Sequence, residues 1–498
     1  MNLASLLDQH PADRVALTHR GEPTTYGELR AAAGALRGEL HTLGLEPGDR
    51  ISIVASTNVQ FVTAYFAVVG AGFIASPLNP RSPATELASE ISSVEARAII
   101  VGPAGAASVR ELERSIIPSV EHILVPPGVE LDGAQTIGEI GGPPIDVVEV
   151  ADADVAALLF TSGTAGSPKA AMLTHGNLIT NLDQIAANPG GSIQPDDVVL
   201  CAIPLFHILG LNAVLAVGLR AGARLVLVER FDPASVLEIV TEEKVTIISG
   251  PPTLWAALAN LPDVDSSALA ELRRGYSGAA TLTRDVYDRV KETFGVSLIE
   301  GYGLTESGAA LAIGADDTPV GSVGKPLPGV EIRLVDRHFD DVYIGDEGEV
   351  LAKGPNIFAG YWNDAEATNR AIDGDGWLHT GDLAVVDDDG WLRLVDRVKD
   401  LIVVSGFNVY PGEVEAILHR HPAVSAAAVI GVPHPHHGEA VRAYVVPEPG
   451  MQVEEDDLIA FCANQIAHYK CPVSISVVDE IPRTATGKVR RRDLRSSV

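Results

Sequence analysis

The amino-acid sequence predicts a mixed α/β protein with a large amino-terminal domain of layered α/β sheets, a β-rich subdomain and a small carboxy-terminal α+β domain. Between residues 15 and 228, short apolar runs rich in β-branched residues alternate with alanine-rich segments of helical period, which is typical of parallel sheets covered by helices. Over residues 320–396 the pattern changes to short apolar runs punctuated by glycine. The rest of the chain carries helical and strand patterns of its own, and about a hundred residues can fold alone.

Individual elements of the amino-terminal domain follow from these patterns. Strands are predicted over residues 51–54, 97–101, 198–203 and 224–228, and a helix over residues 26–43. A second helix is expected to begin at Thr174 or His175, because apolar residues at helical spacing follow this capping position. The residues expected on its buried face are Leu178, Ile179, Leu182, Ile185 and Ala186.

The two later regions carry different signals. In the β-rich subdomain, Asp389–Gly390 predicts the tight turn of a hairpin. Near the carboxyl terminus we expect helices over residues 412–419 and 454–469, and strands over residues 423–430 and 441–446. The predicted domain boundary lies in a charged segment between two apolar strands, which gives domains of residues 1–395 and 396–498.

Length and charge limit the functional classes. The chain has 498 residues, more than one core usually organises, and 46% of them are hydrophobic, so two or more domains are expected. Its 36 lysines and arginines against 66 aspartates and glutamates give a formal net charge of -30, which repels nucleic-acid phosphates and anionic lipid. Nucleic acid is therefore not expected as a partner, and the basic run at residues 488–492 is interpreted as a solvated tail.

Cysteine usage and hydropathy favour a cytoplasmic protein. Cys201, Cys462 and Cys471 have no CxxC spacing and are too few for a disulfide framework. The first residues show neither the basic start nor the apolar stretch of a secretion signal. Residues 201–219 are apolar, but they include proline, histidine and asparagine, so we expect a buried strand and helix there and no transmembrane segment.

The most informative segment is residues 158–169, where an apolar run of strand character leads into a loop of serine, threonine and glycine that closes on Lys169. Glycine lets backbone N–H groups approach an anion, hydroxyls donate further hydrogen bonds, and lysine adds a mobile positive charge, so the loop suits phosphate. A Walker A loop requires serine or threonine after its lysine, whereas Ala170 follows here. An ordinary P-loop NTPase is therefore disfavoured, and at this point a plain glycine–serine linker stays an alternative.

Four further motifs follow the loop along the chain. They are residues 300–306 (EGYGLTE), 380–382 (TGD), 396–400 (DRVKD) and 482–488 (PRTATGK). Together with the loop they closely resemble the adenylate-forming, or AMP-binding, superfamily of acyl-CoA synthetases, peptide-synthetase adenylation domains and beetle luciferases. Residues 404–411 (VSGFNVYP) resemble the bacterial fatty acyl-CoA synthetases most closely. This resemblance extends from the phosphate loop almost to the carboxyl terminus, and it implies the layered α/β fold described above with a mobile carboxy-terminal domain.

The resemblance implies which residues bind ATP. The residues that it places around the β- and γ-phosphates are Thr161, Ser162, Gly163, Thr164 and Lys169. In the second motif, which begins with Glu300 and Gly301, it places Tyr302 along the adenine face, Thr305 at the α-phosphate and Glu306 on Mg²⁺, a hard ion that prefers oxygen ligands. For Tyr302 and Thr305 the alternative is an ordinary turn between a strand and a loop.

The later motifs are expected to complete the nucleotide site. By resemblance, Asp382 accepts hydrogen bonds from the ribose hydroxyls and Arg397 helps to hold the same sugar and phosphate; a turn-forming aspartate is the alternative for Asp382. Lys488 resembles the catalytic lysine, whose charge offsets two approaching anions. Lys399 resembles the hinge residue at which the small domain turns between the two half-reactions. A solvated tail lysine and a salt-bridge residue are the respective alternatives.

The acyl and thiol sites are implied in the same way. His207 resembles the gate residue beside the acyl carboxylate, and Gly278 and Ala279 resemble the small residues that line the acyl pocket. Ser405 and Gly406 are then expected to border the route of the pantetheine arm. The alternatives are a core histidine and tight packing of secondary-structure elements.

These residues predict an ATP-dependent acid–CoA ligase that requires Mg²⁺, forms an acyl-adenylate and pyrophosphate, and then lets coenzyme A displace AMP. A medium- or long-chain fatty acid is expected, because the segment around Phe206 and His207 has no acidic residue for an α-amino group. The alternatives are a fatty acyl-AMP ligase that serves a carrier protein, which the uninterrupted run at residues 321–336 disfavours, and a ligase for an aromatic or short dicarboxylic acid. A non-catalytic nucleotide sensor is a more distant alternative.

The sequence leaves several properties open. Acyl length and type depend on the depth of a pocket, which motifs do not encode. Oligomeric state, with a homodimer among the alternatives, is equally undetermined. Peripheral membrane association would depend on a local patch that the acidic average hides.

Overall fold

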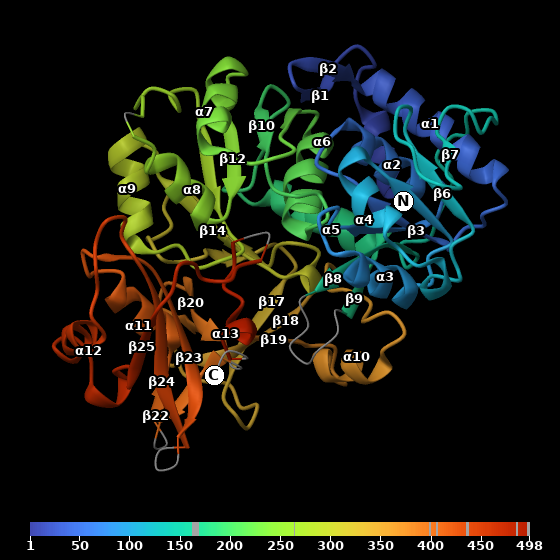
Figure 1. Ribbon diagram of the computed structural model, residues 1–498. Helices are drawn as coiled ribbons and strands as arrows, with labels where there is room; N and C mark the ends of the chain where they lie inside the picture. The colour runs from blue at the N-terminus through green and yellow to red at the C-terminus, as the bar shows by residue number, and fades with distance from the viewer. Residues whose placement is uncertain are drawn as a thin grey trace. The chain divides into compact units, whose positions relative to one another are not determined.

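The structure is a computed structural model that describes residues 1–161, 169–262, 264–397, 400–404, 407–434, 438–484 and 487–495. The chain divides into two compact units. Unit 1 comprises residues 1–318, 323–331 and 352–378, and unit 2 comprises residues 319–322, 332–351 and 379–498. Figure 1 labels many of the elements of both units.

The first sheet of unit 1 joins, among the described residues, seven strands in the order β7-β6-β5-β3-β4-β8-β9. Its strands are β3 (Arg50–Val54), β4 (Ile74–Leu78), β5 (Ala98–Val101), β6 (His122–Val125), β7 (Gln135–Thr136), β8 (Val155–Thr161) and β9 (Lys169–Thr174). Every neighbouring pair is parallel except β8 and β9, which are antiparallel. The helices of this region are α1 (Tyr26–Thr42), α2 (Val59–Gly70), α3 (Ala84–Ser93) and α4 (Ala106–Arg110).

The second sheet of unit 1 has, within the described part of the chain, nine strands in the order β16-β15-β14-β13-β12-β10-β11-β1-β2. They are β1 (Val15–His19), β2 (Glu22–Thr25), β10 (Val198–Cys201), β11 (Arg224–Leu227), β12 (Ile247–Gly250), β13 (Arg274–Ser277), β14 (Leu298–Tyr302), β15 (Ala312–Ile313) and β16 (Lys325–Pro326). The strands from β1 to β14 in this order are parallel to their neighbours. The helices are α5 (His175–Ala187), α6 (Val217–Ala221), α7 (Pro233–Glu242), α8 (Pro252–Ala259), α9 (Arg284–Phe294) and α10 (Ala365–Ala371).

The predicted parallel α/β architecture is confirmed, and the four predicted strands correspond to β3, β5, β10 and β11. They do not share one sheet, because β3 and β5 belong to the first sheet and β10 and β11 to the second. Apolar periodicity identifies a buried strand but carries no information on its partners, which long-range contacts decide. Each sheet packs its own buried cluster, one around Ile99 and Leu158 and the other around Trp255.

The apolar segment at residues 201–219 forms core, as predicted. It contains the end of β10, a π-helical turn, η4 (Leu209–Ala216), and the start of α6, and most of its side chains in η4 are buried. None of the helices among the described residues is both long and apolar enough to cross a membrane. A π-helix is rare in proteins and often marks a functional region, so η4 is of interest for the site.

Helix α5 begins where it was predicted to begin. Thr174 is its N-cap, and Thr174 and Asn177 form a reciprocal capping box. The prediction of its buried face is wrong at Ala186, which is exposed, whereas the polar residues Asn181 and Gln184 are buried. A polar side chain becomes buried where it finds hydrogen-bond partners, and hydrophobic periodicity does not register such partners.

Unit 2 contains most of a sheet with the order β17-β18-β19-β20, which are β17 (Glu331–Val335), β18 (Gly348–Lys353), β19 (Leu378–Val386) and β20 (Leu392–Arg397). A second sheet joins β21 (Ile402–Val404), β22 (Phe407–Val409), β23 (Val424–His434), β24 (Gly438–Pro447) and β25 (Ser474–Val477). The helices are α11 (Pro411–Leu418), α12 (Glu455–Ala463) and α13 (Arg491–Arg495). The predicted turn at Asp389–Gly390 joins antiparallel β19 and β20, and Gly390 has a φ of 81°.

The predicted strands of the carboxy-terminal region are confirmed as β23 and β24, and α11 corresponds to the first predicted helix. The second predicted helix is shorter than expected: α12 ends at Ala463, and a separate 3-10 turn, η7 (His468–Lys470), lies at the end of the predicted range. The predicted boundary at residue 396 concerns movement about Lys399, which lies outside the described residues. This boundary stays a prediction.

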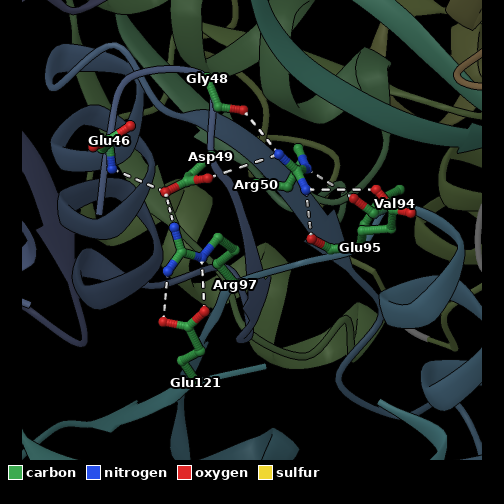
Figure 2. Close-up of polar contacts among 8 residues, drawn as sticks. All are labelled: Glu46, Gly48, Asp49, Arg50, Val94, Glu95, Arg97 and Glu121. Carbon is green, nitrogen blue, oxygen red and sulfur yellow. Dashed lines mark hydrogen bonds and ion pairs between the residues drawn. The ribbon is translucent and has the colours of Figure 1, made fainter. Parts of the chain in front are cut away.

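A group of charged side chains links the amino ends of three neighbouring strands of the first sheet (Figure 2). Arg97, before β5, donates to both carboxylate oxygens of Glu121, before β6, at 3.1 and 2.5 Å. It also donates to Asp49, before β3, at 3.0 Å. Ligands of parallel sheets bind outside the carboxyl ends of the strands, so a group at the amino ends has a structural role.

Candidate active site

The predicted phosphate loop connects two antiparallel strands. Thr161 at the end of β8 and Lys169 at the start of β9 are register partners, and the Thr161 Oγ1 donates to the Lys169 carbonyl at 3.5 Å. Ser162, Gly163 and Thr164 lie outside the described residues. A P-loop continues into a helix whose amino end faces the phosphate, whereas strand β9 follows the predicted loop here, and the predicted phosphate contacts of Thr161 and Lys169 stay predictions.

A short segment, residues 358–362, runs antiparallel beside β9 and is called the 358–362 strap below. Met172 donates its N–H to the Gly360 carbonyl at 2.9 Å, and Trp362 donates to the Ala170 carbonyl at 2.8 Å. Ala171 and Tyr361 form a bridge between these hydrogen bonds. The strap therefore places Tyr361 next to the strand that begins with Lys169.

Tyr361 connects two of the predicted nucleotide-binding residues. Its hydroxyl donates to Glu306 Oε1 at 2.7 Å, and the Lys169 Nζ lies 5.1 Å from the centroid of its ring. Burial, followed by the nearby Glu306 carboxylate, raises the pKa of Tyr361, so the hydroxyl keeps its proton and stays a donor. The structure thus brings Lys169 and Glu306, which are 137 positions apart in their numbering, to the same aromatic side chain.

Glu306 lies on a sharply turned loop, residues 304–310, called the Glu306 turn below. Thr305, Glu306 and Ser307 form one turn of 3-10 helix, η5 (Thr305–Ser307). The Ser307 hydroxyl accepts from the Leu304 N–H at 3.0 Å and closes this turn. At its start, a Cβ on Gly303 would lie 1.9 Å from the Ala309 carbonyl oxygen, so glycine is required there.

Two buried asparagines hold the end of the Glu306 turn. Asn212, in η4, is 1% exposed and donates to the Gly308 carbonyl at 2.8 Å. Asn181, in α5, is fully buried; it donates to the Ala310 carbonyl at 2.8 Å and accepts from the Ala310 N–H at 3.2 Å. The turn is thereby fixed to two different helical elements.

A third buried amide holds the middle of the turn. Asn356 donates to the Ser307 carbonyl at 2.9 Å, and Gln184 donates to the Asn356 Oδ1 at 3.5 Å. Asn177 donates to the Ile357 carbonyl at 2.8 Å and so ties α5 to the start of the strap. Each of these amides satisfies backbone groups that would otherwise be buried without partners, which fixes the position of Glu306.

The other predicted residues of the second motif belong to strand β14. Tyr302 is 6% exposed and pairs with Ala312 of β15, and Glu300 is 9% exposed and pairs with Ser277 of β13. A Cβ on Gly301 would lie 3.6 Å from its nearest neighbours, which is ordinary contact distance. The geometry leaves the predicted contacts of Tyr302, Glu300 and Gly301 with the nucleotide as predictions.

The predicted acyl residues lie at the same edge of the second sheet. His207 follows the carboxyl end of β10, Gly278 follows that of β13, and the Glu306 turn follows that of β14. These strands run parallel, so all three segments leave one edge, where ligands of such sheets bind. His207 is half-buried, and its Nδ1 accepts from the Leu209 N–H at 3.2 Å.

Small residues leave space beside β13. A Cβ on Gly278 would meet only the Gly301 carbonyl, at 3.4 Å, and Ala279 has a φ of 66°, which is uncommon for a residue with a side chain. Strained backbone of this kind concentrates at ligand sites. The geometry is compatible with the predicted acyl pocket at Gly278 and Ala279.

Unit 2 carries the remaining predicted residues. Asp382 is 5% exposed, its N–H donates to the Thr380 Oγ1 at 3.1 Å, and its Cα is the register partner of Arg397 across β19 and β20. Lys399, Ser405 and Gly406 lie outside the described residues. The predicted roles of these positions therefore stay predictions.

Lys488 lies in a closed loop of unit 2. Its carbonyl accepts from the Thr484 N–H at 2.8 Å, and its own N–H donates to the Thr484 Oγ1 at 3.1 Å. Arg483 and Val489 bridge the two sides of the loop, and Gly487 has a φ of 81°. The described residues on the two sides of this glycine-containing segment are therefore hydrogen-bonded to each other, and the catalytic role of Lys488 stays a prediction.

The described residues fit a magnesium site that is shared with a phosphate ligand. Among them, no group of three or more histidine, cysteine, aspartate or glutamate side chains could hold a metal ion. Mg²⁺ usually binds through one or two carboxylates together with substrate phosphates and water. Within the described part of the chain, Tyr361 donates to one oxygen of Glu306, which leaves the second oxygen for a metal ion.

Residues 4–362 match the model of the AMP-binding enzyme family, and residues 413–488 match that of the AMP-binding enzyme C-terminal domain. The chain belongs to the AMP-binding enzyme family. The predicted adenylate-forming resemblance and the fold class are thereby confirmed. A crystal structure of ATP-bound MatB from Rhodopseudomonas palustris has a TM-score of 0.91, 32% identity, and coverage of 100% of this chain and 98% of that chain.

Three curated relatives are similar over nearly their whole length. A (7a-methyl-1,5-dioxo-octahydro-1H-inden-4-yl)propanoyl:CoA ligase of Mycobacterium tuberculosis is 37% identical, over 99% of this chain and 97% of its own. A feruloyl-CoA synthase of an Amycolatopsis species is 36% identical, over 96% and 95%. A long-chain-fatty-acid–CoA ligase of Escherichia coli is 34% identical, over 97% and 92%. The protein is an ATP-dependent, AMP-forming acid–thiol ligase that uses coenzyme A, and the predicted requirement for Mg²⁺ stays a prediction.

Sequence reasoning missed Tyr361 and the buried amides at 181, 212 and 356. Residues 360–362 are a glycine followed by two aromatic residues, which an analysis of patterns interprets as core. An asparagine at position 212 within an apolar run was a usable signal, because a polar residue in such a run must find a partner. The partner itself, the Gly308 carbonyl, could not be found without the fold.

Proposed function

We propose that the acid is a hydrophobic monocarboxylic acid, with medium- or long-chain fatty acids as the preferred substrates. The observation that supports this most is the composition of the predicted acyl edge. Residues 204–216 and 277–280 contain no lysine, arginine, aspartate or glutamate, so neither an α-amino group nor a second carboxylate has a charged partner there. The open side of Gly278 leaves room for a chain, and the E. coli relative is named for long-chain fatty acids.

The reaction proceeds in two steps. A carboxylate oxygen attacks the α-phosphorus of ATP, the bond to the β-phosphate oxygen breaks, and pyrophosphate leaves. The sulfur of coenzyme A then forms a bond to the acyl carbon, the thiol proton passes to solvent, the bond between the acyl carbon and the phosphate oxygen breaks, and AMP leaves. In our proposal Lys169 holds the β- and γ-phosphates, Glu306 holds the Mg²⁺ that spreads their charge, Thr305 contacts the α-phosphate, and Lys488 offsets the approaching carboxylate.

A panel of acids tests the substrate proposal. The protein is incubated with ATP, Mg²⁺, coenzyme A and, in turn, octanoate, dodecanoate, hexadecanoate, ferulate, benzoate and malonate, and AMP release is measured. We expect the highest kcat/KM for an aliphatic acid, at least about tenfold above ferulate, because each buried methylene adds roughly 0.8 kcal/mol. A higher kcat/KM for ferulate, benzoate or malonate would contradict the proposal.

An aromatic acid is the second candidate. It is favoured by the feruloyl-CoA synthase relative, whose 36% identity is two percentage points above that of the fatty-acid relative. The same panel separates the two candidates. Omission of coenzyme A tests the carrier-dependent alternative: if acyl-AMP accumulates equally with and without coenzyme A and no thioester forms, the acyl group goes to a carrier protein.

We propose that residues 396–498 move as a domain about Lys399 between the two half-reactions. Lys399→Pro restricts the backbone at this position, so we expect it to slow one half-reaction strongly and leave the other within about twofold of the wild type. The adenylating step is measured as acid-dependent pyrophosphate release, and the thiol step from preformed acyl-adenylate. Normal rates in both steps would rule out a hinge at this residue.

The catalytic role of Lys488 has its own test. Lys488→Ala is expected to lower adenylate formation by about 10²–10³-fold, a range typical of a lost charge-stabilising donor, while thioester formation from preformed acyl-adenylate stays normal. Lys291→Ala, on the surface of α9, is the control.

We also propose a cytoplasmic location, which is supported by three buried free cysteines.

A further inference from the structure

We propose that Tyr361 is a positioning residue of the nucleotide site: its hydroxyl orients Glu306 for Mg²⁺, and its ring holds the Lys169 ammonium group away from that carboxylate. This inference rests on the proposed roles of Lys169 and Glu306. It goes beyond them because no motif of the sequence analysis includes Tyr361. In this arrangement Tyr361 keeps the positive charge of Lys169 and the negative charge of Glu306 apart until a ligand binds.

The position of the Tyr361 ring is fixed from several directions. The backbone bridge to Ala171 sets its register on β9, and its N–H donates to the Thr368 Oγ1 at 2.9 Å. Phe358 contacts the ring edge to face, with centroids 4.9 Å apart. The Glu306 turn is joined to the same strap, because Phe358 donates its N–H to the Glu306 carbonyl at 2.9 Å. The backbone of the 358–362 strap therefore positions both the Tyr361 ring and the Glu306 residue that accepts its hydrogen bond.

The next residue anchors the strap to the first sheet. Trp362 packs against the buried cluster of that sheet, and the Arg50 guanidinium lies 5.7 Å from the centroid of its ring. Arg50 is held in turn by the carbonyls of Val94 and Glu95, at 2.9 and 2.8 Å (Figure 2). Tyr361 thus lies between Trp362, which packs on the first sheet, and the Glu306 turn, whose backbone is held by buried amides. A side chain can orient another one when its own position is fixed in this way.

The charges explain why a tyrosine is useful at this position. A lysine and a glutamate that face each other directly would form an ion pair, and each would lose part of its attraction for a ligand. Tyr361 offers each partner a weaker interaction: the ring face attracts the ammonium group, and the hydroxyl occupies one carboxylate oxygen. The second oxygen of Glu306 and the ammonium hydrogens of Lys169 are then directed to Mg²⁺ and phosphate.

Two substitutions separate the two roles. Tyr361→Phe removes the hydroxyl and keeps the ring, whereas Tyr361→Leu removes both. Tyr26→Phe is the matched control, because Tyr26 is also buried and donates its hydroxyl to main-chain carbonyls of Leu219 and Ala223. Circular dichroism and the midpoint of thermal unfolding show whether each variant is folded as the wild type.

Calorimetric titration with ATP, with Mg²⁺ and with excess chelator, measures the two roles without any turnover. For Tyr361→Phe we expect about tenfold weaker binding of Mg·ATP and unchanged binding of metal-free ATP, since a hydrogen bond to a charged group contributes about this much. Tyr361→Leu is expected to weaken both, because Lys169 loses its support. Tyr26→Phe should match the wild type in both titrations.

A double-substitution cycle decides whether the hydroxyl acts through Glu306. In a Glu306→Gln background, Tyr361→Phe should change Mg·ATP affinity less than twofold. Wild-type affinity of Tyr361→Phe for Mg·ATP, or an undiminished effect in the Glu306→Gln background, would overturn the inference. Failure of the proposed function looks different, because a wild type that binds Mg·ATP but activates no hydrophobic acid leaves the titrations interpretable.

Discussion

Two groups of charged side chains in unit 1 use their charges differently. At the amino ends of β3, β5 and β6, Arg97 contacts both oxygens of Glu121 and one of Asp49, and Arg50 lies 3.8 Å from the other oxygen of Asp49, so these charges are paired with each other (Figure 2). At the start of β9, Lys169 and Glu306 instead contact the ring and the hydroxyl of one tyrosine. The first arrangement stabilises the fold, whereas in our proposal the second keeps a cation and an anion available for a ligand.

The positions of the two groups agree with this difference. The amino ends of parallel strands are the end of a sheet at which ligands do not bind, and paired charges there contribute only to stability. The Glu306 turn leaves the carboxyl end of β14, and buried amides from α5, η4 and residue 356 fix its backbone. In such a site, neutral buried side chains fix the backbone that carries a few charged groups, and these charged groups are then available to a ligand.

The strongest test of the comparison is the removal of one cation from each group, beginning with the site. Lys169→Met is expected to raise the KM for ATP by at least about tenfold, since one charge-assisted phosphate contact is lost, and to leave the unfolding midpoint nearly unchanged. Initial rates over a range of ATP concentrations measure the effect. An unchanged KM together with a lower unfolding midpoint would show that Lys169 is only structural.

Substitution of an asparagine that holds the Glu306 turn should lower both the stability of the protein and its kcat. Asn212→Ala leaves the buried Gly308 carbonyl without its donor, so we expect a loss of about 1–3 kcal/mol in the free energy of unfolding and a lower kcat. Asn188→Ala is the control, because Asn188 is half-buried and its amide donates at a longer distance, 3.3 Å, to the Ile313 carbonyl. Equal stability and kcat in both variants would contradict the proposed support.

The buried, neutral His175 at the start of α5 should make the stability of the protein depend on pH. Burial lowers the pKa of His175 from 6.5 to about 4, and its Nδ1 accepts from the Leu3 N–H at 3.0 Å. Between these two pH values the unfolded chain binds a proton that the folded protein does not bind, so stability is complete above pH 6.5 and decreases as the pH falls toward 4.

This residue should cost about 2 kcal/mol of stability on going from pH 7 to pH 5. Urea unfolding followed by tryptophan fluorescence at the two pH values measures the loss. His175→Asn removes the titrating group, so its stability should fall less over the same interval. A variant with the same pH dependence as the wild type would show that another group is responsible.

The smallest effect is expected for the internally paired charges at the amino ends of β3, β5 and β6. Arg97→Met, with Glu121→Gln to avoid an unpaired carboxylate, should lower the free energy of unfolding by at most about 1 kcal/mol, because partly exposed ion pairs contribute little. Its kcat and KM for ATP should equal those of the wild type. A change in KM comparable to that of Lys169→Met would break the distinction between the two groups.

Much of the fold could be predicted because it depends on local patterns. The runs that became β3, β5, β10 and β11 were identified from apolar and β-branched residues, and α5 from its capping position at Thr174. The division of these strands between two sheets could not be predicted, since it depends on contacts between distant segments. The error at Ala186 has the same cause, because Asn181 is buried by its partner Ala310, 129 positions away.

The candidate site shows the same limit. Lys169, Glu306, Asp382 and Lys488 could be predicted as site residues because their motifs are short and continuous in the sequence. Tyr361 lies 55 positions from Glu306 and has no distinctive neighbours, so only the pairing of the strap with β9 reveals it. The proposed charged residues of the site can thus be predicted from the sequence, whereas the residue proposed to orient them can be found only in the fold.

A crystal structure of the protein with Mg·ATP tests the central claim most directly, namely that separate motifs bind one nucleotide. We predict that Lys169 contacts the β- or γ-phosphate, that the metal ion is bound to Glu306 with Tyr361 still on its other oxygen, and that Asp382 contacts the ribose of the same molecule. A nucleotide bound elsewhere, or one that reaches Asp382 without Lys169 and Glu306, would contradict the account.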